Sequence, residues 1–144
     1  MKKNLKSTIM KKLLVLIVLV LSSVSMFSQI TSNGKPEVLK SFRLGNCKLI
    51  NTDGAISIEA TVIEATGLKL TVELGGKNQA IAILQSMVDY KPAKGETVSL
   101  NNPSDNEAEY RKIMGDWLIL SRSGVASISV TKGEMKKMIT ALNE

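Results

Sequence analysis

Two glutamates are the residues that the sequence pattern best places to do chemistry together. Residues 56–62 and 68–74 each alternate apolar and polar side chains, which is typical of half-buried strands. If a three-residue turn joins them, the large apolar side chains share one face and Glu59 lies directly opposite Glu73 on the other. A close carboxylate pair could serve acid–base catalysis or weak calcium binding. The simpler interpretation is two solvated glutamates near Lys69, because exposed carboxylates cost little free energy in water.

Other signatures of catalysis are weak or missing. The chain has no His, which removes the commonest general base and the commonest metal ligand. Ser129 and Lys132 have the S-x-x-K spacing of serine acyl-enzymes, but the companion S-D-N and K-T-G motifs are missing and Ser129 falls inside a predicted strand. The sequence contains no P-loop, dinucleotide-binding, zinc or EF-hand spacing. We therefore expect no catalytic residues, no bound metal and no cofactor.

The segment from Met1 to Ser28 is typical of a secretory signal peptide. Five lysines precede an apolar run at residues 13–21, and small residues follow it. The preferred cleavage position lies between Ser28 and Gln29, and Ser25 is the alternative. The run is shorter than the roughly 20 residues of a membrane span, which favours cleavage over an uncleaved inner-membrane anchor. The short, lysine-rich segment predicts a bacterial protein that is periplasmic or secreted and leaves the membrane after cleavage.

Most of the net positive charge of the chain comes from the lysines of that segment. The chain has 19 Lys and Arg against 13 Asp and Glu, and removing the five early lysines leaves 14 basic residues against 13 acidic ones. A nearly neutral body does not fit a polybasic surface for nucleic acid or anionic lipid. We expect no nucleic-acid partner. A ββα module for single-stranded nucleic acid stays open only as a disfavoured alternative, because it needs a basic sheet face with exposed aromatic residues.

Cys47 is the single cysteine, so no intrachain disulfide can form despite the predicted export. It alternates with Leu49, which favours a buried strand position over a thiol that joins two chains. Trp117, the single tryptophan, also fits the apolar face of a strand better than an exposed stacking platform.

The rest of the pattern predicts one small α+β domain. Residues 29–37 form a flexible leader and residues 38–144 form the domain. The expected strands are 38–44, 47–50, 56–62, 68–74, 96–100, 117–122 and 125–131, and the expected helices are 77–90, 104–114 and 132–142. We expect a mostly antiparallel sheet with the two main helices, 77–90 and 132–142, packed on one face.

Each expected helix has a start signal. Asn78 is a candidate N-cap for the first helix. Ser104 with Glu107, and Thr131 with Glu134, match the capping box that opens a helix.

The order strand, turn, strand, capped helix occurs twice. One constant offset superimposes Leu70 on Ile128 and Ile81 on Ile139. Two interpretations stay open: a pseudo-symmetric ββα duplication, or two unrelated hairpins that each precede a helix.

These observations favour an exported, non-catalytic binding or protein-interaction module. Its partner would be an unidentified protein or small ligand of the cell envelope, and a homodimer through a sheet edge is one form of such binding. The alternative is an envelope enzyme of unfamiliar type that uses Glu59 and Glu73 as a carboxylate pair, which would then have to line a cleft.

Overall fold

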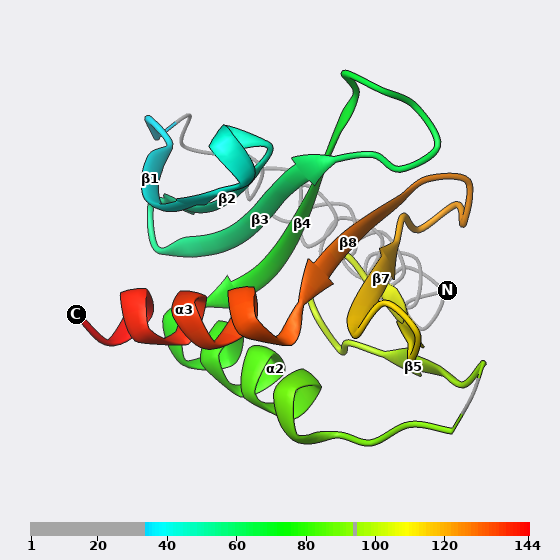
Figure 1. The fold of residues 1–144 in the computed structure, drawn as a ribbon. Helices are drawn as coiled ribbons and strands as arrows, with labels where there is room; N and C mark the ends of the chain where they lie inside the picture. Colours follow the sequence, from blue (N-terminus) through cyan, green and yellow to red (C-terminus); the bar gives the residue numbers. More distant parts are fainter. Residues whose placement is uncertain (1–33, 94) are drawn as a thin grey trace, which may run out of the picture. The chain divides into compact units, whose positions relative to one another are not determined.

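The computed structural model describes residues 34–93 and 95–144, and these form a small α+β fold (Figure 1). The first half contains β1 (Glu37–Phe42), the short 3₁₀ turn η1 (Arg43–Gly45), β2 (Cys47–Thr52), β3 (Ala55–Thr61), β4 (Lys69–Gly76) and α2 (Lys77–Asp89). The second half contains β5 (Thr97–Ser99), β6 (Glu107–Arg111), β7 (Asp116–Leu120), β8 (Ser127–Thr131) and α3 (Lys132–Asn143). Each half forms an antiparallel four-stranded sheet, in the orders β1-β2-β3-β4 and β5-β6-β7-β8.

The predicted signal peptide and its cleavage position between Ser28 and Gln29 lie outside the described residues. In the described part of the chain, no helix combines the length and the apolar character needed to cross a membrane.

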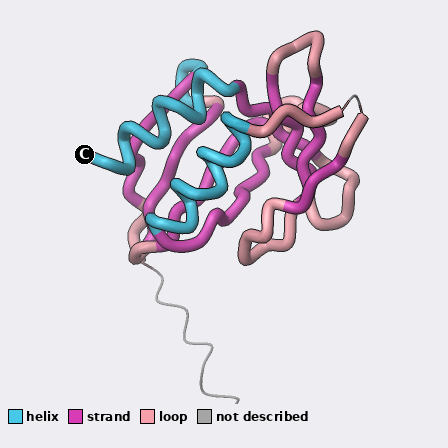
Figure 2. The backbone as a smooth tube through the Cα atoms, turned by 90° about the horizontal axis from the view of Figure 1, so that it is seen from below, coloured by secondary structure: helices cyan, strands magenta, loops and turns pink. Residues whose placement is uncertain are grey.

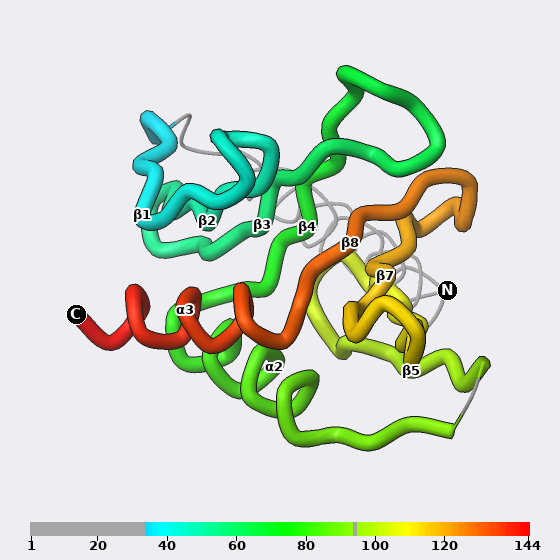
Figure 3. The backbone as a smooth tube through the Cα atoms, viewed as in Figure 1, coloured from blue at the N-terminus to red at the C-terminus, as the bar shows by residue number. Residues whose placement is uncertain are grey.

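The two helices pack against each other on one side of the β1–β4 sheet (Figures 1 and 2). Helix α2 contacts β4 and β3, and helix α3 contacts β1 and β8. Figure 3 shows that β4 continues directly into α2, and β8 into α3. Buried apolar side chains from both sheets and both helices form one hydrophobic cluster. The prediction of an α+β domain with two helices on one face is confirmed, although the strands form two sheets rather than one.

The two halves share a plan of four strands and a helix, larger than the predicted ββα unit. The helices correspond when Lys77 is superimposed on Lys132, which places Ile83 on Met138. The four apolar positions that this superposition matches all pack into the core at helical spacing. The predicted superposition of Ile81 on Ile139 is wrong, because it shifts the helices by almost one turn.

The same plan extends to one polar contact at the start of each helix. Gln79 and Glu134 both occupy the third helical position. The Gln79 amide donates to the backbone oxygen of Asn101, just after β5, at 3.3 Å, and Glu134 accepts from Nε of Arg43, just after β1, at 2.7 Å. Each helix is therefore tied to the turn that follows the first strand of the other half.

The predicted pairing of the second hairpin is confirmed, and that of the first is wrong by two residues. Trp117 pairs with Val130, as expected. In the first hairpin Ile58 pairs with Val72 rather than with Leu74. The turn is longer than the three residues expected, since the Val62 backbone N–H donates to the oxygen of Leu68 at 2.8 Å. A shift of two residues keeps every side chain on its face, so apolar alternation alone does not distinguish the two registers.

The predicted helix at residues 104–114 is wrong, because this segment is a turn followed by β6. Asn102 and Asn106 are buried, and the Asn102 side-chain oxygen accepts from the Asn106 backbone N–H at 2.8 Å. Such local side-chain bonds stabilise turns in competition with helix. In β6, buried Ala108 lies between the less buried Glu107 and Glu109, the period-two pattern of a strand.

Of the N-caps predicted for the two main helices, one is confirmed and the other is wrong. Thr131 is the N-cap of α3 and forms a complete capping box with Glu134, as predicted. The predicted cap Asn78 is wrong, because α2 begins after Gly76 and that N-cap has no side-chain hydrogen bond. Cys47 and Trp117 are both 0 % exposed, which confirms their predicted burial.

Candidate functional site

The two glutamates predicted to form a pair do not lie opposite each other. Glu59 pairs with Thr71 and Glu73 pairs with Ser57, so the carboxylates are diagonal neighbours on one face. The Glu59 carboxylate instead accepts from Nζ of Lys69 at 3.0 Å. An exposed ion pair of this kind contributes at most about 1 kcal/mol. The register places the lysine, rather than a second acid, at the Glu59 carboxylate.

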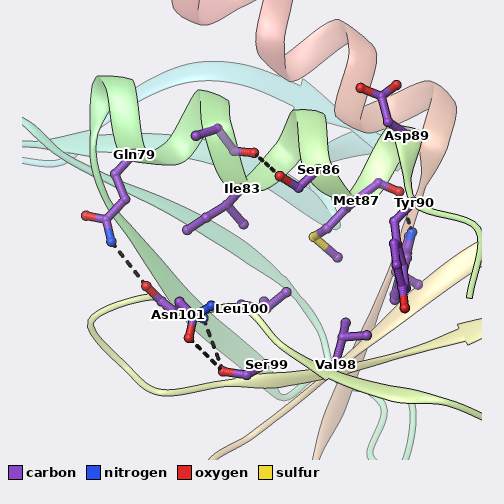
Figure 4. Close-up of a pocket in the computed structure, with 12 residues that line it drawn as sticks. Gln79, Ile83, Ser86, Met87, Asp89, Tyr90, Val98, Ser99, Leu100 and Asn101 are labelled. Atoms are coloured by element: carbon purple, nitrogen blue, oxygen red, sulfur yellow. Dashed lines mark hydrogen bonds between the residues drawn. The ribbon is translucent and has the colours of Figure 1, made fainter.

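A groove of about 730 Å³ lies between α2 and β5, and we call it the α2–β5 groove (Figure 4). Its apolar walls are Ala82, Ile83, Met87, Val98, Leu100 and Trp117. Its polar rim includes Gln79, Ser86, Tyr90, Ser99 and Asn101. Apolar walls with a few polar groups at the rim are typical of ligand sites, and the volume is within their usual range.

The groove exists because α2 presents small side chains beside a very short strand. Ala82 and Ser86 leave space along the helix, and the Ser86 hydroxyl donates to the Ala82 carbonyl oxygen at 2.8 Å, within the helix itself. Ile83 and Met87 point from α2 toward β5 in Figure 4. They are 9 % and 3 % exposed, so these two side chains do not form a broad exposed apolar patch.

The two ends of the groove are defined by polar side chains (Figure 4). At one end the Gln79 amide reaches across to the backbone oxygen of Asn101. At the other end the exposed Tyr90 ring stacks on Trp117, with ring centroids 6.5 Å apart. The Tyr90 hydroxyl donates to Glu96 at 2.5 Å, and this bond raises the pKa of Tyr90 and lowers the pKa of Glu96. The bond to Glu96 and the stacking on Trp117 hold the Tyr90 side chain in place at this end of the groove.

Trp117 lies on β7 and connects the groove to the core. Its indole N–H donates to the carbonyl oxygen of Met87, and its ring is 5.3 Å from that of Tyr110. The Lys132 ammonium lies 5.0 Å from the centre of the Tyr110 ring and donates to the Tyr90 carbonyl oxygen at 3.2 Å. These contacts fix the orientation of the aromatic side chains beside the groove.

A second, polar hollow of about 410 Å³ borders β5 on the other face of its sheet. Ser99 lines both hollows. The polar hollow also contains Asp105, Glu107 and Arg122. Ser99 and Glu107 are register partners, and the neighbouring pair Val98 and Ala108 faces the core, which places the two hollows on opposite faces of the sheet.

Two other carboxylates, those of Asp116 and Glu64, form hydrogen bonds that link neighbouring strands and loops. Asp116 accepts from Nε of Arg111 at 3.0 Å and also from the Ser129 hydroxyl. Glu64 accepts from the Ser127 backbone N–H at 2.8 Å, and bonds from the Ser127 hydroxyl and N–H lower the Glu64 pKa. Among the residues that the structure describes, no three His, Cys, Asp or Glu side chains gather as a metal ion would require.

Sequence reasoning missed the groove entirely. Trp117 is predicted on the apolar face of its strand, and its burial is confirmed, but no sequence pattern predicts that Trp117 also lines a groove with Ile83 and Met87. The two small residues Ala82 and Ser86, one helical turn apart on α2, are the local indication of missing volume on that side. No protein-family model, curated protein or solved structure matches the chain.

Proposed function

We propose that this protein is an exported, non-catalytic binding module and that the α2–β5 groove is its ligand site. The proposal rests on one observation: an apolar groove with polar side chains at both ends lies between α2 and β5. At the equivalent junction in the other half, α3 packs directly against β1. Export and a place in the periplasm or outside the cell rest on the pattern of residues 1–28 alone.

The equivalent junction in the other half supports this reading. There α3 packs directly against β1, and Leu39 and Phe42 of β1 are partly buried against the core. Strand β1 has six residues, whereas β5 has three. The shorter strand leaves the side chains of α2 without an equivalent cover. The fold thus has one filled and one open copy of the same junction, and the open copy is the place where a ligand can bury apolar surface.

The enzyme alternative has less support. It needs two carboxylates in a cleft, but Glu59 is ion-paired with Lys69 on a sheet face and neither it nor Glu73 lines the α2–β5 groove. The groove is lined by a single carboxylate, Asp89, which accepts from the Gln85 amide at 2.8 Å. Its other polar groups are hydroxyls and amides, and those of Ser86 and Gln79 are bonded within the protein. Covalent catalysis would require a nucleophile with an adjacent base.

The test uses N-phenyl-1-naphthylamine, an apolar dye whose emission rises in an apolar environment. We expect saturable binding to the purified protein. Ala82→Phe adds a ring inside the groove and should weaken dye binding at least tenfold. Gln85→Phe adds the same ring at an exposed position of α2 outside the groove and should leave binding within twofold. Equal binding by the two variants would exclude the groove as the site.

Export is tested separately by fractionating the source cells and sequencing the amino terminus of the recovered protein. Cleavage between Ser28 and Gln29 predicts a chain that begins at Gln29 and is found outside the cytoplasm. Recovery of an intact Met1 on a cytosolic protein would contradict export while leaving the dye experiment unaffected.

A further inference from the structure

Strand β5 presents backbone groups on its open side. It is an edge of its sheet, with β6 as its one neighbour in the described chain. The Leu100 backbone N–H donates to the oxygen of Asn106 at 2.9 Å, and Val98 is the register partner of Ala108. In an antiparallel pair the backbone groups of alternate residues point toward the partner. Those of Leu100 and Val98 therefore point toward β6, and those of Thr97 and Ser99 point away from it, along the groove.

The two faces of this edge differ in chemistry. Side chains on the α2 side meet the apolar walls formed by Ile83 and Leu100. On the other side, Ser99 of β5 borders the polar hollow, whose charged residues are Asp105, Glu107 and Arg122 and therefore carry a net negative charge. A strand added at β5 would send its side chains alternately to these two faces. Alternating apolar and basic side chains would complement both.

We propose that the ligand of the α2–β5 groove is an extended polypeptide segment that adds to β5 as a fifth strand, with apolar and basic side chains in alternation. The proposal rests on the proposed function and specifies its ligand class. Addition of a strand to an exposed edge is a general mode of peptide recognition, in which backbone bonds supply affinity and pockets for alternate side chains supply selectivity. Here Thr97 and Ser99 supply the backbone bonds.

The length of the groove sets the length of the segment. The lining residues of α2 run from Gln79 to Asp89, which at 1.5 Å per helical residue is about 15 Å. An extended chain rises by about 3.3 Å per residue, so about five residues fill the groove. Strand β5 has three residues, so the paired part of the ligand is shorter than the part that lies against α2.

The test uses fluorescein-labelled peptides and fluorescence anisotropy. We expect the alternating peptide KVKLKVK to bind at least tenfold more tightly than KKKKVLV, which has the same composition without alternation, and than EVELEVE. Single N-methylation along KVKLKVK should weaken binding tenfold or more at every second amide, and less than twofold at the amides between. Equal binding of the alternating and block peptides, or no alternation in the N-methyl series, would overturn strand addition.

Substitution of Ser99 tests the same bond from the protein side. Ser99→Pro removes the outward N–H and leaves the pairing with β6 intact, because proline is tolerated on edge strands when its nitrogen faces away from the sheet. We expect Ser99→Pro to bind KVKLKVK tenfold more weakly than the unchanged protein, and equal binding by the two proteins would contradict the role of this N–H. The N-methyl series uses the unchanged protein, so it tests the proposal even if the proline variant does not fold.

The dye separates this inference from the proposed function. If N-phenyl-1-naphthylamine binds, Ala82→Phe abolishes its binding and KVKLKVK does not displace it, the groove is a binding site but strand addition is wrong. If Ala82→Phe has no effect on the dye, the proposed function itself is wrong.

Discussion

The indole Nε1 of Trp117 donates a hydrogen bond to the carbonyl oxygen of Met87 at 2.9 Å. Met87 lies in the last turn of α2, where the final four carbonyl groups have no partner within the helix. Trp117 therefore supplies a donor from the neighbouring sheet for one of these carbonyl groups. Because both residues also line the α2–β5 groove, the contact that ends the helix also shapes the site.

Trp117→Phe should lower the free energy of unfolding by about 2–4 kcal/mol, since the variant leaves the Met87 carbonyl without its donor and removes ring volume from a side chain that is 0 % exposed. Urea unfolding followed by far-UV circular dichroism measures the loss. Tyr110→Phe is the control, with an expected change below about 0.5 kcal/mol, because it removes only a hydroxyl from a partly buried ring. Similar losses in the two variants would contradict the role given to the indole bond.

The elements that sequence reasoning predicted correctly are those that local signals determine. Helix α3 combines a capping box at Thr131 with apolar residues at helical spacing. In the second hairpin a short turn and one set of large apolar residues select the pairing of Trp117 with Val130. Every interaction that these predictions used lies within a few residues along the chain or across a single turn.

The features that sequence reasoning missed depend on contacts between distant segments. The Asn102 amide donates to the backbone oxygen of Glu73 at 2.6 Å, and the Asn106 amide donates to that of Leu120 at 2.8 Å. These bonds hold the segment before β6 as a turn, although Ser104 and Glu107 match a capping box. The groove likewise depends on where α2 lies relative to β5, which no local pattern encodes.

Alanine substitutions at Thr131 and Asn78 test the two residues that the sequence predicts as helix N-caps. Thr131→Ala removes the side chain that accepts from the Glu134 backbone N–H at 3.1 Å and should cost about 1 kcal/mol of unfolding free energy. Asn78→Ala, in the first turn of α2, should change it by less than about 0.5 kcal/mol, since Asn78 is not the N-cap. Chemical denaturation of both variants gives the comparison, and a larger loss for Asn78→Ala would contradict the observed helix start.

The Cys47 thiol should be unreactive in the folded protein. Burial raises the pKa of Cys47 to about 11, with a further contribution from the charge of Glu134 that Arg43 partly opposes. Since the thiolate is the reactive form, its fraction near pH 8 falls about a hundredfold relative to an ordinary thiol. The Ellman reagent should react at least a hundredfold more slowly without denaturant than in urea. Rapid labelling of the native protein, or a disulfide-linked dimer on mild oxidation, would contradict this burial.

Asp116 should make stability depend on pH in the acid range. Its side chain is 4 % exposed; burial alone would raise the Asp116 pKa, but hydrogen bonds from Arg111 and Ser129 outweigh burial and lower it below 3.8. A carboxylate with a lowered folded-state pKa adds stability above its unfolded pKa, and this contribution is lost as the pH falls through the folded value. The stabilising effect of Asp116 is therefore complete at neutral pH and disappears only in strong acid.

Asp116→Asn should therefore destabilise the protein at pH 7 by about 1–3 kcal/mol, because the variant loses the charge-assisted bonds while Arg111 keeps partial contact with water. The difference from the unchanged protein should stay constant from pH 7 to about pH 5 and shrink as the pH falls below about 3.8. Urea unfolding at pH 7, 5, 4 and 3 measures it. Glu59→Gln is the matched control: it removes a carboxylate from the more exposed pair with Lys69, and we expect a loss below about 1 kcal/mol at every pH. A difference for Asp116→Asn that grows toward low pH would show that Asp116 is protonated more readily in the folded chain than in the unfolded one, and would contradict the assigned ion pair.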